Sequence, residues 1–207
     1  MIVENIFFKI AYILASYLLG SVVFAYVMAK IYKFEGMGKV DRPGTAGSGR
    51  QIGYKASIPV FLFDVGKGAL VILVARWIGL DQVTMVVAAL AVLAGHNWPV
   101  FYKFRGGGGL ATAMGIGVAL VPLEFAITMA ISLSIVFIYK YTLGKKHKVN
   151  PNVIGGLIGA TIFPLIVAFI PPRRDLPIIL LFCGIFLIIV VKGIILHLKY
   201  RKVPTAN

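Results

Sequence analysis

Long uncharged runs are the feature of this sequence that most limits how it can fold. The first run, from Ile10 to Ala29, lies between Lys9 and Lys30 and has the length that crosses a bilayer as a helix. It is too long for the apolar region of a signal peptide, and Glu4 stands where a basic segment would precede such a region. We therefore interpret it as a retained transmembrane helix. A mean hydropathy of +0.93 extends this interpretation to the whole chain, because soluble domains are less apolar.

Seven apolar segments, bounded by charged residues, glycines and prolines, are expected to cross the membrane as helices. They cover residues 8–32, 57–75, 82–99, 107–121, 123–141, 152–170 and 176–197. Pro122 separates the short, glycine-rich fourth segment from the fifth, and these two could instead form one kinked helix. The expected fold is all-α, a seven-transmembrane helix bundle that forms a single membrane domain over residues 1–207.

Lysine and arginine are distributed unevenly between the two sides of this bundle. Fifteen of the 21 lie after the first, third and fifth segments or towards the C-terminus, and four lie on the other side. The positive-inside rule therefore predicts an outside N-terminus and a cytoplasmic C-terminus, in a multi-pass protein of a bacterial-type inner (plasma) membrane. The net charge of +14 lies beside membrane segments, which favours membrane lipids or a phosphorylated ligand as partners and disfavours nucleic acid.

The first cytoplasmic loop, residues 41–53, combines small residues with arginine. Its small residues, among them Gly44, would let backbone N–H groups converge on an anion, and Arg42 and Arg50 can add bidentate contacts. The sequence therefore predicts a phosphate or carboxylate site here. The alternative is a flexible loop whose arginines meet lipid headgroups.

The second loop, residues 95–109, ends in Gly106, Gly107, Gly108 and Gly109 immediately before an apolar helix. Unpaired amides at a helix N-terminus favour anion binding, and the nearby Lys103 and Arg105 strengthen that interpretation, with Thr112 in the first helical turn. The spacing is not that of a Walker motif. We predict a phosphate site at this loop.

Asp64 and Lys67 lie within the second apolar segment, and His96 lies near the end of the third. Asp64 and Lys67 are three residues apart, so they share a helix face and can pair, either to brace the bundle or to serve a site. His96, at the cytoplasmic end of the third segment, could act as a general base, bind substrate, or be a structural donor.

Metal and redox chemistry have little support in this composition. The one cysteine, Cys183, excludes an internal disulfide, and three scattered histidines do not make a metal site. We expect neither a metal nor a cofactor.

Four motifs resemble those of the PlsY-type acyl-phosphate:glycerol-3-phosphate acyltransferase family. Gly20-Ser21 resembles its Gly-Ser motif, and residues 42–53 are similar to its Asn-Pro-Gly-Ala-Thr-Asn-x-x-Arg-x-x-Gly stretch. Residues 64–68 resemble its Asp-x-x-Lys-Gly, and residues 95–112 resemble its Gly-His-x-x-Pro…Phe-x-Gly-Gly-Lys-Gly-Val-Ala-Thr. The similarity covers the first four segments, and beyond residue 122 it rests on hydropathy.

This resemblance implies a seven-span enzyme of phospholipid synthesis that moves an acyl chain from acyl-phosphate to glycerol 3-phosphate or a similar phosphorylated acceptor. It implies no cofactor, because acyl-phosphate is an activated donor. It implies catalytic roles for His96 and Asp64, and phosphate binding by the loop residues named above, with Lys67.

Several positions depart from the family pattern. In the preferred register Val40 stands where the family has serine, whereas an alternative register places Ser48 there. Gly108 stands where the family has the lysine of Gly-Gly-Lys-Gly, and Lys192 to Asn207 holds no clear match to its His-x-x-Asn-x-x-Arg-Leu signature. A non-catalytic homologue that binds a lipid or phosphorylated metabolite is therefore the alternative hypothesis. A transporter is a weaker one, since no repeat is visible.

Overall fold

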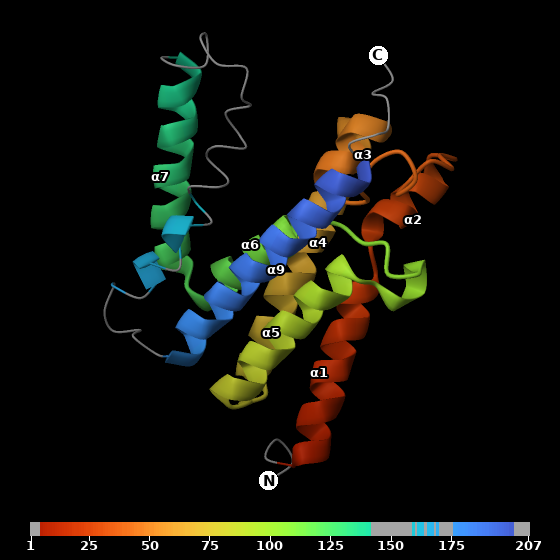
Figure 1. Cartoon of the computed structure of the whole chain (residues 1–207). Helices are drawn as coiled ribbons and strands as arrows, with labels where there is room; N and C mark the ends of the chain where they lie inside the picture. The colour runs from red at the N-terminus through yellow and green to blue at the C-terminus, as the bar shows by residue number, and fades with distance from the viewer. Residues whose placement is uncertain are drawn as a thin grey trace.

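The structure, a computed structural model, describes residues 5–141, 159, 161–163, 165–167, 169 and 176–200. Within those residues every named element is a helix (Figure 1). This confirms the all-α fold class. The elements are α1 (Ile6–Ser21), α2 (Phe24–Ile31), α3 (Thr45–Gln51), α4 (Tyr54–Trp77), α5 (Gln82–Asn97), the 3-10 helix η2 (Val100–Tyr102), α6 (Leu110–Leu120), α7 (Pro122–Tyr141) and α9 (Leu176–Tyr200).

Five described helical segments are long and apolar enough to cross a membrane: Ile6–Ile31, Tyr54–Trp77, Gln82–Tyr102, Pro122–Tyr141 and Leu176–Tyr200. The chain is therefore a multi-pass membrane protein. The shorter apolar helix α6 corresponds to the expected fourth segment. The expected sixth segment, 152–170, lies largely outside the described residues.

The first apolar segment is interrupted, where the sequence indicated one continuous helix over 8–32. Val22 and Val23, between α1 and α2, have extended backbone conformations. The break frees carbonyl groups, and those of Gly20 and Val22 each accept a hydrogen bond of 3.2 Å from Lys67 Nζ. A buried ammonium group from α4 thus donates hydrogen bonds to the carbonyl groups that the helix break leaves unpaired. Hydropathy alone does not reveal this break.

The fourth and fifth segments are separate helices. The α6 helix ends at Leu120, Val121 leaves the helical conformation, and Pro122 begins α7, a position that proline favours because it lacks an N–H group. The α6 helix also begins later than expected, at Leu110, because residues 106–109 are not helical. Figure 1 shows α7 standing to one side of the other helices.

Small residues bring two pairs of helices into close contact. A Cβ atom on Gly20 in α1 would collide with the backbone of Val92 in α5, and one on Gly68 in α4 would collide with the backbone of Thr112 in α6. Close backbone approach through glycine is a common way for membrane helices to associate. The buried apolar core lies mainly between α4, α5, α6 and α9.

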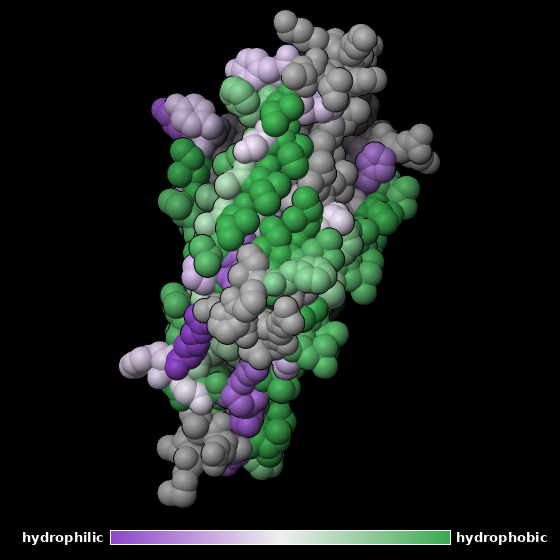
Figure 2. All heavy atoms as spheres, turned by 90° about the vertical axis from the view of Figure 1, so that its left-hand side faces the viewer, coloured by the Kyte–Doolittle hydropathy of each residue, from purple (hydrophilic) through white to green (hydrophobic). Residues whose placement is uncertain are grey.

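The outer surface is apolar, as expected for lipid contact. Large side chains such as Phe7, Leu62, Trp77, Phe137 and Leu187 are more than half exposed. Figure 2 shows hydrophobic residues over most of the described surface on the side of α7. The C-terminal end of α9 lies beside the segment that precedes the first loop, where Tyr200 OH donates to the Gly38 carbonyl at 2.9 Å.

Candidate functional site

The second loop is held in place by side chains of the first apolar segment. Tyr17 OH donates to the Trp98 carbonyl at 2.8 Å, and Tyr26 OH donates to the Arg105 carbonyl at 2.7 Å. Ser21 Oγ accepts from the Val100 N–H at 3.4 Å. The Gly20-Ser21 motif therefore lies where the interrupted helix supports this loop.

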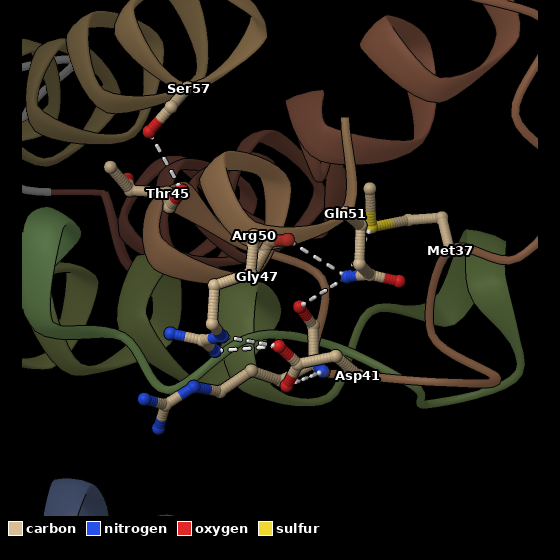
Figure 3. A network of polar contacts seen from close by, with 8 residues as sticks. Met37, Asp41, Thr45, Gly47, Arg50, Gln51 and Ser57 are labelled. Carbon is tan, nitrogen blue, oxygen red and sulfur yellow. Dashed lines mark hydrogen bonds and ion pairs between the residues drawn. The ribbon is translucent and has the colours of Figure 1, made fainter. Parts of the chain in front are cut away.

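The first loop is organised by Asp41 (Figure 3). One carboxylate oxygen of Asp41 accepts from Arg50 Nε and pairs with Arg50 Nη2, both at 2.7 Å, and the other accepts from the Arg42 backbone N–H at 2.7 Å. Ser57 Oγ of α4 donates to the Thr45 carbonyl at 2.8 Å. These contacts tie the start of α3 to α4. None of them involves the Arg42 side chain.

The two loops meet through glycine. A Cβ atom on Gly107 would collide with the Pro43 carbonyl oxygen and with His96 Nε2, and one on Gly44 would lie 3.8 Å from the Gly107 Cα. A Cβ atom on Gly106 would collide with the His96 carbonyl oxygen. Gly109 has a positive φ of 81°, and a Cβ atom there would collide with the Asn97 side chain. Of the four successive glycines 106–109, all but Gly108 are therefore required by close packing.

A buried polar cluster lies beneath the loops. Lys67 Nζ lies 2.8 Å from Asp64 Oδ1 and 2.9 Å from His96 Nδ1, and His96 Nδ1 lies 3.3 Å from Asp64 Oδ1. All three side chains are buried. The expected pairing of Asp64 with Lys67 is confirmed, and the contacts of Lys67 with α1 make it a brace between helices.

A cavity of about 280 Å³ opens where the two loops and this cluster meet. One part is polar and is formed by the start of the first loop with Asp64, His96 and the backbone of the second loop. The other part is apolar and is formed by α4 and α6. The lining residues are Arg42, Pro43, Gly44, Thr45, Ala46, Gly47, Phe61, Asp64, His96, Gly108, Gly109, Leu110, Ala111 and Met114.

The electrostatics of the polar part are set by Arg42. Burial lowers the pKa of its guanidinium group from the ordinary value, and the charge of Arg50 lowers it further, while Asp41 opposes both. Arginine stays protonated in proteins at physiological pH. The cavity therefore holds a permanent positive charge, which suits an anion.

The structure brings together about half of the residues that the sequence indicated. Asp64, His96, Arg42, Gly44, Gly108 and Gly109 line the cavity. Gly106 and Gly107 pack against His96 beside it. The other predicted residues, Arg50, Lys67, Arg105 and Thr112, also lie outside the lining.

Two buried polar residues, one in α5 and one in α9, are not among the predicted site residues. Asn97 is fully buried, and in the described part of the chain its side-chain amide has no hydrogen-bond partner. Lys192 of α9 is also buried. A polar residue directly after His96, and a lysine interrupting the last apolar run, are the sequence signals that could have identified them. Within the described residues, no group of three His, Cys, Asp or Glu side chains could hold a metal ion.

The chain resembles known proteins along most of its length. The model of the glycerol-3-phosphate acyltransferase family matches residues 10–202. A protein of that name from Neisseria gonorrhoeae (strain NCCP11945) is 34% identical over 180 residues, which are 81% of this chain and 82% of the relative.

Other relatives match over a shorter region. Glycerol-3-phosphate acyltransferase 4 of Dehalococcoides mccartyi (strain CBDB1) is 37% identical over 63% of this chain, and the Thermoanaerobacter pseudethanolicus protein is 38% identical over 61%. The chain matches 57% and 64% of the length of these two relatives, less than two thirds of each.

Solved structures share the fold. The crystal structure of PlsY, an integral membrane glycerol 3-phosphate acyltransferase, in its glycerol 3-phosphate form aligns with a TM-score of 0.75 at 24% identity, over 96% of each chain. Its lysophosphatidic acid form aligns with a TM-score of 0.73. The motifs, the family match and the fold agree, and this chain belongs to the glycerol-3-phosphate acyltransferase family.

Proposed function

We propose that the protein transfers an acyl group from an acyl-phosphate to the 1-hydroxyl of glycerol 3-phosphate, giving lysophosphatidic acid and phosphate for phospholipid synthesis. The observation that carries this proposal is the cavity, which has a cationic, polar part beside an apolar wall of Phe61, Leu110, Ala111 and Met114. An acyl-phosphate has the same division between an anionic head and an apolar chain. The names of the relatives support acyl transfer to glycerol 3-phosphate.

The reaction needs orientation and charge stabilisation more than a strong nucleophile. The acceptor hydroxyl oxygen attacks the carbonyl carbon of the donor, the bond from that carbon to the phosphate oxygen breaks, and the leaving phosphate takes up the hydroxyl proton. Arg42 and the backbone amides of the second loop would stabilise the negative charge that moves onto phosphate. Aligning the hydroxyl with the carbonyl supplies a further part of the rate.

His96 is proposed as the side chain that positions a substrate oxygen. We propose the tautomer in which Nδ1, 2.9 Å from Lys67 Nζ, accepts a hydrogen bond from the ammonium group. The imidazole proton then lies on Nε2, the nitrogen beside Gly107. The Asp64 carboxylate, 2.8 Å from Lys67 Nζ, compensates the positive charge of that lysine and fixes its position beside His96. We place Arg50, Arg105 and Thr112 as supports of the phosphate region around the cavity.

The proposed orientation is a seven-span domain with its N-terminus outside and this cavity at the cytoplasmic side of a bacterial inner membrane. The two loops, with Arg42, Arg50 and Arg105, lie at the same end as Tyr200 of α9. Positively charged loops favour the cytoplasmic side. A Cys183→Ser protein with one new cysteine at Lys39 or at Gln82 tests the orientation: only the Gln82 cysteine should react with an impermeant thiol reagent in intact cells.

The reaction itself is tested with purified, folded protein in detergent, acyl-phosphate and glycerol 3-phosphate. Release of phosphate that depends on both substrates, with formation of lysophosphatidic acid, is the expected result. A panel of other phosphorylated acceptors identifies the preferred one. Absence of turnover with every acceptor, in protein shown to be folded, would overturn the proposal.

A second candidate function is binding without catalysis, and one observation favours it: Gly108 occupies the position of a lysine in the family motif. The Gly108→Lys protein separates the two functions. A gain of acyl transfer from an inactive starting protein identifies a disabled enzyme, whereas wild-type turnover removes this candidate.

A further inference from the structure

Lys192 is a buried cation in the last membrane helix. Its side chain is 4% exposed, and Nζ lies 5.0 Å from the centre of the Trp98 ring. Within the described residues, no carboxylate lies close enough to form an ion pair with it. A charged group at this depth is costly, so that unpaired intramembrane lysines usually mark a functional site.

Lys192 belongs to the face of α9 that packs over the second loop. A Cβ atom on Gly108 would lie 3.9 Å from Leu196 Cδ1, and Lys192 is one helical turn before Leu196 on the same face. The Trp98 ring beside Lys192 and the Gly108 position beside Leu196 thus both belong to the second loop, which forms part of the polar side of the cavity.

The space at Gly108 differs from that at the other three glycines. Side chains at Gly106, Gly107 and Gly109 would collide with α5, the residues that follow it or the Pro43 carbonyl of the first loop, whereas a Cβ atom at Gly108 meets only Leu196 at ordinary contact distance. Gly108 also has no positive φ. The second loop therefore leaves space beside Gly108 for a side chain, and Leu196 of α9 borders this space. The loop itself contributes no charged side chain at that position.

We propose that Lys192 supplies, from α9, the positive charge that binds a substrate phosphate at the Gly108 end of the cavity. This inference rests on the proposed function. Without substrate the ammonium group lies against the Trp98 ring, which is a favourable place for an unpaired cation. When a phosphate monoester or acyl-phosphate binds, the flexible side chain leaves the ring and contacts the phosphate oxygens, since Lys192 itself is not among the lining residues.

Three variants test the inference: Lys192→Met, Lys192→Arg and the double variant Lys192→Met with Gly108→Lys. We expect Lys192→Met to lower kcat/KM about 10- to 100-fold, as for loss of one charged contact to phosphate. Lys192→Arg should keep most of the activity. The double variant should recover much of the activity lost in Lys192→Met, because a lysine side chain at position 108 extends into the same region.

The matched control is Lys140→Met, which removes a lysine that also lies over a ring, that of Tyr141 at 5.6 Å, on α7 away from the cavity. Melting temperatures in detergent are measured for all variants. The KM values for glycerol 3-phosphate and for acyl-phosphate are measured separately, and the one that rises in Lys192→Met identifies which phosphate Lys192 binds. A Lys192→Met protein as active as wild type overturns the inference, as does a loss that Gly108→Lys leaves unchanged.

Failure of the proposed function is distinguishable from failure of this inference. A wild-type protein without turnover overturns the function, and Lys192 is then judged by binding. Glycerol 3-phosphate and inorganic phosphate should raise the melting temperature of wild type and of Lys140→Met, and raise that of Lys192→Met much less. Equal shifts in all three proteins overturn the role of Lys192.

Discussion

The Nζ atom of Lys67 lies 2.9 Å from Nδ1 of His96, so that a lysine of α4 and a histidine of α5 meet in the interior of the protein. The same Nζ contacts Asp64 and the two carbonyl groups freed by the break after α1. Three apolar segments are therefore joined at one ammonium group. This junction sets the position of His96 in the cavity.

Replacing Lys67 should destabilise the protein strongly. In Lys67→Met the Asp64 carboxylate loses its closest cation while it remains buried, and breaking a buried ion pair from one side costs about 3–5 kcal/mol. Unfolding in detergent, followed by circular dichroism, measures this loss. The double variant Lys67→Met with Asp64→Asn removes both charges and should recover part of it. A single variant as stable as wild type would show that the pair does not brace the bundle.

Two glycines of α4 should respond in opposite ways to alanine. Gly68→Ala forces a methyl group against the backbone of Thr112 and should cost about 1–3 kcal/mol, as overpacking does. Gly66→Ala meets nothing within 4 Å and should gain up to about 1 kcal/mol from helix propensity. The same unfolding measurement compares them. Equal effects would contradict the close packing of α4 on α6.

Activity should depend differently on two adjacent glycines of the second loop. Gly107→Ala places a methyl group against His96 Nε2 and the Pro43 carbonyl, and the resulting displacement should lower kcat/KM about 100-fold. Gly108→Ala meets only Leu196 and should lose less. Phosphate release measures both. If the two variants lost activity equally, the contact between the loops would not govern the site.

Arg50 and Asp41 form a matched pair for the first loop. The Arg50 side chain is 53% exposed, so either Arg50→Ala or Asp41→Ala should lower stability by no more than about 1 kcal/mol. We expect Arg50→Ala to lower kcat/KM more than Asp41→Ala, because only the former removes positive charge from the proposed phosphate region. Equal losses would mean that Arg50 acts only by anchoring Asp41.

At the opposite end of the bundle, Asp81 should make stability depend on pH. A hydrogen bond from Lys9 at 2.6 Å, with further bonds from Thr84, holds the pKa of Asp81 well below its ordinary value. Stabilisation from a lowered carboxyl pKa is present at neutral pH and is lost as pH falls through the folded-state pKa. Asp81→Asn should therefore be less stable than wild type at pH 7, by at most about 1 kcal/mol because the pair is partly exposed.

That difference should shrink as the pH falls below about 4, the ordinary range of an aspartate. Unfolding curves of both proteins at several pH values provide the comparison. The lysine replacement Lys9→Met should reproduce the effect at pH 7. A difference that grows on acidification would contradict the assignment.

Much of the fold followed from local pattern. Uncharged runs predicted α4, α5, α7 and α9 to within a few residues, because lipid requires long apolar helices with internally satisfied backbones. Pro122 correctly indicated a division between α6 and α7. The break at Val22 and Val23 could not be predicted in this way, since both residues are apolar. The group that hydrogen-bonds to the freed Val22 carbonyl is a lysine 45 residues later in the sequence.

The sequence by itself determined that this is an all-α membrane protein with two glycine-rich, arginine-bearing loops, since hydropathy and glycine content are local properties. It also identified the Asp64 and Lys67 pair, because helical spacing places them on one face. Only the tertiary structure decided which candidates share a cavity. Arg42, Asp64, His96 and Gly108 come from different segments and line one cavity, and Lys192 of the last helix lies over the Trp98 ring of the second loop. These distances across the bundle depend on how closely the helices pack.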